Sequence, residues 1–341
     1  MKALTFDRFG GPEVLTYREI PDPVFPPGPG YALVRTQAIG LNFADIYRRR
    51  GNYHLQGAPP YVAGYEAAGV IEALTQGNTV PAAAPDGRPV PSSFRVGQRV
   101  AFADSPFANA ELVVVPLGKL IPLPDDVSSE TGAALFLQGL TAQYLVRDSH
   151  PLRPGETALI HAAAGGVGLL LVQICKLLGA RVLGLASSPA KAEAARAAGA
   201  DAVARYDEDW VAAALRFAPG GVDVVYDSVG STLLDSFRAT RIGGRVVFYG
   251  MAGGDPPAVD PRMLMDTSKT LTGGDLWNVL GDFAERQRRA GELLDWVRTG
   301  RLQVRVAASF PLARGAEAHR LLESRGVIGK VLLLPEPLPF S

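Results

Sequence analysis

Residues 157–168, TALIHAAAGGVG, decide the fold of this chain. The apolar run at 157–161 predicts a buried strand, and the apolar sequence GVGLLLVQICKLL predicts a helix over 166–178 that is closed by Gly179. A glycine-rich turn joins the two. A strand, a tight turn and a helix in direct succession are typical of the first half of a βαβ unit.

The same alternation continues along the chain. Apolar strands that carry hydrophobic residues on both faces indicate a parallel sheet covered by helices, so we expect an α/β fold with a Rossmann doubly wound parallel sheet. The predicted strands cover residues 157–161, 181–186, 202–206, 222–227, 244–249 and 270–274, and the helices 166–178, 189–198 and 232–241.

The glycine-rich turn predicts a dinucleotide site. In the pattern G-x-G-x-x-G, its glycine positions are held by Ala163, Gly165 and Gly168. A glycine at the second position lets the backbone approach a pyrophosphate, and the helix N-terminus offers unpaired N–H groups to it. Glycine turns also occur simply to make room, but this one lies between a strand and a helix.

The end of the second strand distinguishes the two common dinucleotides. An NAD site places an Asp or Glu there for the ribose hydroxyls, whereas this chain has Ser187 and Ser188. Lys191 follows, and Arg205 and Tyr206 end the third strand. The absence of a carboxylate and the nearby donors favour NADPH over NADH. The alternatives are a solvated helix face for Lys191 and a sheet-edge aromatic role for Tyr206.

The amino-terminal part has a different pattern. Short β-type runs between Gly and Pro predict a β-rich domain over residues 1–125 that is completed by 277–341, with the Rossmann domain at 126–276. The β-type runs cover 32–38, 69–74, 99–103 and 110–116; a helix at 283–299 and a strand at 330–334 follow the Rossmann domain. Residues 75–97, rich in Pro, Gly and Ala, predict an exposed excursion.

Composition excludes several classes of function. The 341 residues carry 34 Lys plus Arg and 34 Asp plus Glu, so no net field would collect nucleic acid or anionic membrane. The single cysteine, Cys175, cannot form an intramolecular disulfide, and the four histidines lack metal-ligand spacing. No apolar stretch reaches the ~18 residues of a spanning helix. We expect a soluble cytoplasmic protein with no metal, no nucleic-acid partner and no membrane partner.

Several motifs, in order along the chain, carry a family resemblance. They are GLNFADIYRRRG from Gly40, GYEAAGVI from Gly64, FLQGLTAQYL from Phe136, HAAAGGVG from His161, VVYDSVG from Val224 and AHRLLESR from Ala318. With them the chain resembles the zinc-independent quinone oxidoreductases, the quinone reductase and zeta-crystallin branch of the medium-chain dehydrogenases/reductases. The resemblance implies a GroES-like catalytic domain, a Rossmann domain, NADPH and a homodimer, with a homotetramer as the alternative.

The resemblance also implies the cofactor contacts. The matching positions are Asn42, Thr141, Gly165, Gly166, Val167, Ser187, Lys191, Tyr206, Ser228, Gly250, Met251 and Arg325. Ser228 and Gly250 also follow predicted strands at the carboxyl edge, where ligands bind in such sheets, although an ordinary turn is an alternative for both. In the zinc-dependent relatives a Cys and a His stand where this chain has Asn42 and Tyr65.

Without a metal or an evident acid–base pair, the chain can mainly orient the cofactor against an acceptor that is already electrophilic. Quinones fit best, with reduction of 2-alkenals, other enones or enoyl thioesters as the alternative. A protein that binds NADPH without turnover is the alternative from another class. Tyr47 is the candidate for substrate contact or proton donation, or else it packs against the cleft. We expect structural roles for Glu66 and His161, and a local hydrogen bond from Asp45 that holds the Asn42 loop.

Overall fold

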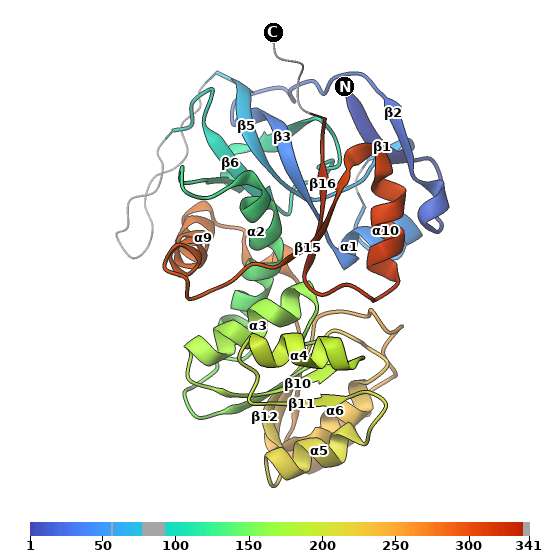
Figure 1. The fold of residues 1–341 in the computed structure, drawn as a ribbon, viewed down its shortest axis with the longest axis vertical. Coiled ribbons are helices and arrows are strands. Elements are labelled where there is room, and N and C mark those ends of the chain that lie inside the picture. The colour runs from blue at the N-terminus through green and yellow to red at the C-terminus, as the bar shows by residue number, and fades with distance from the viewer. Residues whose placement is uncertain (56, 77–92, 337–341) are drawn as a thin grey trace. The chain divides into compact units, whose positions relative to one another are not determined.

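The computed structural model describes residues 1–55, 57–76 and 93–336. The chain forms two compact units (Figure 1). The first unit comprises Met1–Leu137, Leu280–Gly300 and Val304–Ser341, and the second comprises Gln138–Val279 and Arg301–Gln303. The boundary between Leu137 and Gln138 lies inside the helix Ser129–Tyr144. It is twelve residues after the domain boundary that the sequence predicts at 125/126.

The second unit is built on the parallel sheet that the sequence predicts. Its strand order is β11-β10-β9-β12-β13-β14, which is the doubly wound arrangement with the glycine-rich turn after the central strand β9. The predicted fold class is thereby confirmed. The strands are β9 Thr157–Ile160, β10 Arg181–Ala186, β11 Ala202–Arg205, β12 Val222–Asp227, β13 Thr240–Phe248 and β14 Thr270–Gly273.

Helices cover both faces of this sheet. α3 and α4 pack together on β9, β10 and β11, while α5 and α6 pack together on the other side (Figure 1). The buried side chains of Leu159, Leu185, Val225 and Phe237 belong to one apolar core. The helices are α3 Gly166–Leu177, α4 Pro189–Ala197, α5 Trp210–Phe217, α6 Leu233–Ala239, α7 Pro261–Thr267 and α8 Leu276–Val279.

Local chemistry explains where α4 begins and ends. Ser188 caps its N-terminus by accepting a hydrogen bond from the Lys191 amide at 3.3 Å, and Pro189 occupies the first helical position. Gly199 follows the helix with φ +107°, a conformation that glycine adopts without strain. These short-range signals place Lys191 on the first turn of α4.

The first unit is β-rich. Its larger sheet has the order β15-β16-β3-β5-β6-β8 with β7 also paired to β3, and a smaller sheet has the order β2-β1-β4. β16 pairs with β3 in antiparallel register, so the carboxyl-terminal segment completes an amino-terminal sheet. The strands are β1 Lys2–Phe6, β2 Thr16–Glu19, β3 Tyr31–Leu41, β4 Tyr61–Val62, β5 Glu66–Leu74, β6 Arg99–Ala103, β7 Leu112–Pro116, β8 Leu120–Pro122, β15 Val306–Pro311 and β16 Lys330–Leu334.

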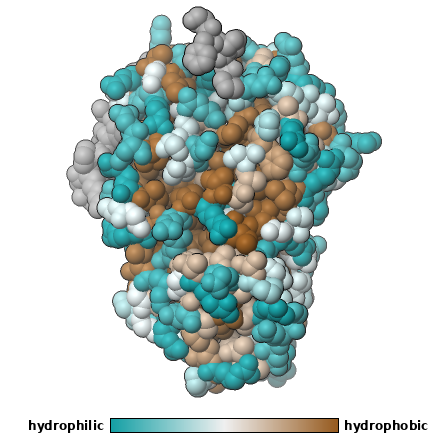
Figure 2. Space-filling model, viewed as in Figure 1, coloured by the Kyte–Doolittle hydropathy of each residue, from teal (hydrophilic) through white to brown (hydrophobic). Residues whose placement is uncertain are grey.

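Four α-helices accompany these described strands: α1 Phe43–Arg50, α2 Ser129–Tyr144, α9 Phe283–Arg298 and α10 Gly315–Glu323. The space-filling view shows hydrophobic side chains gathered on this unit around β15 and β16 (Figure 2). None of the helices in the described part of the chain is long and apolar enough to cross a membrane. The predicted excursion at 75–97 lies mostly outside the described residues, which exclude 77–92.

Candidate active site

The glycine-rich turn has the geometry of a pyrophosphate cradle. α3 begins at Gly166, and no side chain caps its N-terminus. Gly168 packs so tightly that a Cβ there would overlap the Ala162 carbonyl and lie 2.9 Å from Cα of Ala163. A Cβ on Gly166 would overlap the side-chain amide of Gln138. The turn therefore places backbone N–H groups at a helix N-terminus, with the Gln138 side chain against its first residue, and such a cradle fits a dinucleotide.

The residues expected around a 2′-phosphate lie together beside this turn. Ser187 directly follows β10, and the Lys191 ammonium lies 3.2 Å from its hydroxyl. The Tyr206 amide donates to the Ala186 carbonyl, which places Tyr206 next to the end of β10. Arg205 faces two carboxylates instead, with Nε 2.9 Å from Asp207 Oδ1. The positive charge nearest to Ser187 is thus that of Lys191.

The loops after β12 and β13 form the other half of this edge. Ser228 and Gly250 are in contact, because a Cβ on Gly250 would lie 3.1 Å from the Ser228 carbonyl oxygen. The Ala252 amide donates to that same oxygen at 3.0 Å, so Met251 lies in the turn between Gly250 and Ala252. The structure therefore brings Ser228, Gly250 and Met251 together at the carboxyl ends of the neighbouring strands β12 and β13.

The second half of α2 belongs to the second unit and carries Thr141. Gln138, one turn earlier on this helix, is in direct contact with Gly166 of the glycine-rich turn. No motif in the sequence predicts a role for Gln138. The contact between Gln138 and Gly166 joins two helices that are far apart in the local sequence pattern, so only the tertiary structure shows it.

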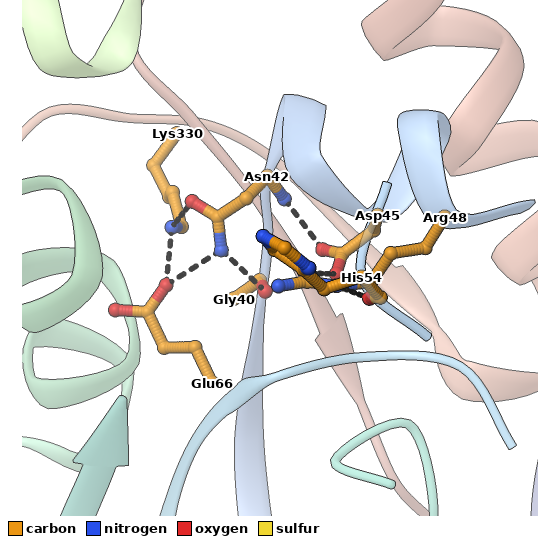
Figure 3. A network of polar contacts seen from close by, with 7 residues as sticks. All are labelled: Gly40, Asn42, Asp45, Arg48, His54, Glu66 and Lys330. Atoms are coloured by element: carbon orange, nitrogen blue, oxygen red, sulfur yellow. Dashed lines mark hydrogen bonds and ion pairs between the residues drawn. The ribbon is translucent and has the colours of Figure 1, made fainter. Parts of the chain in front are cut away.

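In the first unit, Asn42 lies at the centre of a buried polar cluster (Figure 3). The Lys330 ammonium donates to Asn42 Oδ1 at 2.8 Å and to Glu66 Oε2 at 2.5 Å. Asn42 Nδ2 donates to the same Glu66 oxygen at 2.9 Å. We call Asn42, Glu66 and Lys330 the Asn42 network. Its three side chains are 4%, 0% and 1% exposed respectively, so it is shielded from water.

The Asn42 network fixes the orientation of the amide. Lys330 can only donate, so Asn42 must present its oxygen to Lys330 and its nitrogen to Glu66. The other Glu66 oxygen accepts from the Leu137 amide at 2.7 Å. The Asp45 carboxylate accepts a hydrogen bond from the backbone N–H of Asn42 at 2.9 Å, which confirms the expected local hydrogen bond in this loop. Burial raises the pKa of Asp45, although Arg48 opposes the shift.

Tyr47 and Arg48, on the turn of α1 after Asp45, contact aromatic side chains. The Arg48 guanidinium lies 3.3 Å from the ring centroid of Tyr65 and 5.0 Å from that of Tyr53. The Tyr47 ring lies 6.2 Å from those of Phe43 and Tyr53. Tyr65, which stands where the zinc-dependent relatives have a ligand, thus binds a cation through its ring face. Tyr47 is half-buried on this helix.

Arg325 also belongs to the first unit, two residues after the end of α10, with φ +56°. Among the described residues, no group of three or more His, Cys, Asp or Glu is arranged to hold a metal ion. Two contacts of this unit are not predicted from the sequence: Lys330 with Asn42 and Glu66, and Arg48 with the ring of Tyr65. Lys330 lies 288 residues from its Asn42 partner, and no local pattern connects the two.

Family models define the class of this protein. Residues 28–150 match the alcohol dehydrogenase GroES-like domain, and residues 166–293 match the zinc-binding dehydrogenase domain. A GroES-like domain combined with a Rossmann sheet is the architecture of the medium-chain dehydrogenases/reductases, and the chain is a member of that class.

Individual relatives narrow the class to a family. The quinone oxidoreductase of Pseudomonas aeruginosa is 39% identical over 98% of this chain and 99% of its own length. The 2-haloacrylate reductase of a Burkholderia species is 38% identical, with the same coverage of 98% and 99%. The solved structure of Escherichia coli quinone oxidoreductase complexed with NADPH has a TM-score of 0.89 at 34% identity, covering 98% of this chain and 100% of that one. The chain belongs to the quinone oxidoreductase family.

Proposed function

We propose that this protein is an NADPH-dependent reductase whose acceptor is a quinone, reduced without a metal ion. The observation that carries the cofactor assignment is the end of β10, where Ser187 and the Lys191 ammonium stand and an NAD site would have a carboxylate. A quinone is already electrophilic, so binding and orientation suffice for its reduction. The quinone oxidoreductases among the relatives support this choice of acceptor.

The chain's own residues would hold the cofactor at both ends. The backbone at Gly165, Gly166 and Val167 would bind the pyrophosphate, and Ser187 and Lys191 the 2′-phosphate. The remaining proposed contacts are Thr141, Tyr206, Ser228, Gly250 and Met251 in the second unit, with Asn42 and Arg325 in the first. NADPH supplies a hydride from C4 of its nicotinamide.

Two side chains of α1 and its N-cap have proposed roles in the reaction. Asn42 would present a fixed amide to the nicotinamide ribose, because Lys330 and Glu66 hold that amide in one orientation. Tyr47 would contact the acceptor or donate a proton to the reduced product, a role that a phenol can fill at neutral pH. A Tyr47→Phe variant that keeps full turnover would limit Tyr47 to packing.

The cofactor assignment is tested by steady-state kinetics with a soluble quinone. We expect a much larger kcat/KM for NADPH than for NADH. In Lys191→Ala the KM for NADPH should rise about tenfold, the effect of one charge-assisted contact, while the KM for NADH stays constant. Equal use of both cofactors by the unmodified protein would contradict the assignment.

Reduction of an activated carbon–carbon double bond is the second candidate function. The 38% identical 2-haloacrylate reductase acts on a substrate with such a bond, which is a specific reason to consider it. A quinone, a medium-chain enone and 2-chloroacrylate assayed side by side would separate the two, since the larger kcat/KM identifies the acceptor class. Cofactor binding with no turnover on any of them would favour a protein that only holds NADPH.

We also propose a homodimer, or alternatively a homotetramer, that works in the cytoplasm. The family resemblance supports the assembly, and β14 forms an open edge of the sheet in the second unit. Light scattering after size-exclusion chromatography would distinguish these states, and a monomeric mass would overturn the proposal.

A further inference from the structure

A polar side chain from α2 lies against the first residue of α3. The turn itself, residues 162–168 with the sequence AAAGGVG, has no polar or charged side chain. A Cβ built at Gly165 or Gly168 would first meet Ala162, whereas a Cβ at Gly166 would first meet the carboxamide of Gln138. Gln138 therefore supplies a polar side chain to a turn that has none of its own.

The space taken by Gln138 explains why residue 166 is a glycine. From a Cβ at Gly166, Oε1 of Gln138 would lie 2.2 Å away, Nε2 2.4 Å and Cδ 2.5 Å, and real Cβ atoms essentially never make such short contacts. Gly166 holds none of the three glycine positions of the G-x-G-x-x-G pattern, and its φ is not positive. Neither the motif nor the backbone conformation therefore requires a glycine here, but the Gln138 amide does.

Gln138 shares one face of α2 with a proposed cofactor contact. Thr141 follows it by three residues in the same helix, so the two side chains lie on the same side, and both belong to the second unit. Thr141 is the proposed neighbour of the nicotinamide ring, and the backbone of 165–167 is the proposed pyrophosphate contact. Gln138 therefore belongs between them, where the phosphate next to the nicotinamide ribose would lie.

A carboxamide fits this place because it combines an acceptor with a donor. The N-terminus of α3 carries a partial positive charge, which favours Oε1 towards the helix and leaves Nε2 to donate to an anion. Backbone N–H groups are the other donors that this turn offers to a phosphate. A carboxylate in place of the amide would offer no donor and would repel the phosphate.

We propose that Gln138 is a cofactor-binding residue: its carboxamide donates a hydrogen bond to the pyrophosphate of the dinucleotide, and Gly166 lacks a side chain to admit it. The proposal rests on the proposed function, which places the cofactor at this turn, and it adds a side chain to the backbone contacts. Because the pyrophosphate is common to NADPH and NADH, Gln138 strengthens the binding of both and takes no part in the choice between them.

Replacements of similar size at Gln138 test the contact by calorimetric titration with NADPH and NADH and no acceptor present. Gln138→Leu removes the donor, so both Kd values should rise about tenfold, the effect of one hydrogen bond to a charged group. Gln138→Glu adds repulsion, so its losses should exceed those of Gln138→Leu. Gln303→Glu makes the same change at an exposed position of the second unit and should leave both Kd values unchanged.

The pH dependence of Gln138→Glu gives a readout that a packing role would not change. Protonation of the introduced carboxyl removes its charge and restores a donor, and the bound phosphate raises the pKa of that carboxyl. The affinity of Gln138→Glu for NAD⁺ should therefore recover as the pH falls from about 8 to 5, relative to Gln138→Leu. NAD⁺ is suitable here because it is stable in acid and has no 2′-phosphate that titrates in this range.

A double-mutant cycle separates the amide from the backbone of the turn. Gly166→Ala displaces the Gln138 amide, so it should weaken NADPH binding in the unmodified protein and have little further effect in Gln138→Ala, which leaves room for the methyl group. Gly168→Ala is the matched control. It meets backbone atoms instead, so it should cost as much affinity in Gln138→Ala as in the unmodified protein.

The outcomes separate this proposal from the one on which it rests. Unchanged or tighter binding of the dinucleotides by Gln138→Leu, no recovery of Gln138→Glu in acid, or additive effects of Gly166→Ala and Gln138→Ala would each overturn the role of Gln138. Failure of the unmodified protein to bind either NADPH or NADH would overturn the cofactor assignment as well.

Discussion

The Lys330 ammonium and the Glu66 carboxylate neutralise each other in the interior of the first unit. Both charges are removed from water, which costs several kcal/mol per ion unless partners surround them. Here Asn42 and the Leu137 amide supply the remaining hydrogen bonds. Removing one charge should therefore be far more harmful than removing both.

A double-mutant cycle tests this expectation. Lys330→Met leaves the Glu66 charge buried without its cation, and we expect a loss of about 3–5 kcal/mol in the free energy of unfolding. Lys330→Met combined with Glu66→Gln should recover a large part of that loss. Urea unfolding of the four proteins measures the coupling, and simple additivity would contradict the interpretation.

His319 of α10 provides a second prediction at the residue scale, concerning pH. Its side chain is fully buried, and neither ring nitrogen has a hydrogen-bond partner among the described residues. Burial, followed by the charge of Arg49, lowers its pKa from 6.5 to about 3. The unfolded chain therefore binds a proton below pH 6.5 that the folded protein does not bind, and stability falls as the pH decreases from 6.5 towards 3.

Replacement of His319 by Leu should flatten this dependence. At pH 5 the histidine costs about 2 kcal/mol of stability relative to pH 8, because one pKa unit corresponds to ~1.4 kcal/mol. His161 titrates with the same sign and remains in the variant, so part of the slope persists. Urea unfolding between pH 5 and 8 measures the difference, and equal slopes in both proteins would exclude this role for His319.

At the scale of elements, we expect replacement of glycine by alanine to have opposite effects on stability in the two helices α3 and α9. In α3, Gly168→Ala would drive a Cβ into the backbone of Ala162 and Ala163. We expect a loss of about 1–3 kcal/mol and weaker NADPH binding, since the cradle must open. Thermal unfolding and NADPH titration measure the two effects.

Gly291→Ala in α9 is the matched control. A Cβ built at Gly291 would meet no side chain or backbone of another element within 4 Å in the described part of the chain, and the residue lies inside a helix of 16 residues. Alanine should stabilise this helix by about 0.5–1 kcal/mol through its lower conformational entropy in the unfolded chain, with NADPH binding unchanged. Destabilisation here would show that the glycine effect in α3 is not specific to the turn.

At the scale of the whole molecule, the net charge is zero although charged groups are unevenly distributed around the end of β10. The 34 basic and 34 acidic residues balance, yet the end of β10 carries Lys191 next to Ser187 without a carboxylate in the serine's place. We therefore expect ligand choice by this protein to depend on a few positioned groups and not on its overall field.

The preference for NADPH over NADH can be measured on the intact protein as the stabilisation of the native state by each cofactor. NADPH at 100 times its Kd should stabilise the native state by about 2.7 kcal/mol, because it binds the folded and not the unfolded chain. NADH at the same concentration should stabilise it less. Thermal unfolding with each cofactor measures the shifts in Tm, and equal shifts would contradict the assigned role of the strand end.

Features that depend on neighbouring residues were predictable from the sequence. The strand at 181–186 and the start of the helix at 166 are found as predicted, because apolar periodicity, glycines and helix caps act within a few residues. The helices α1, α2, α5 and α10 were not predicted. α1, for example, has only eight residues, and four of them are charged. The excursion predicted at 75–97 stays a prediction, since most of it lies outside the described residues.

The sequence by itself determined the parallel sheet, its glycine-rich turn and the serine at the end of β10, since each is encoded in a short segment. Only the tertiary structure decided the partners of Asn42 and of Tyr206. Lys330 reaches Asn42 across 288 positions, and Tyr206 reaches His161 across 45. A hydrogen bond depends on the distance and direction between two groups, and the sequence pattern around either residue contains neither quantity.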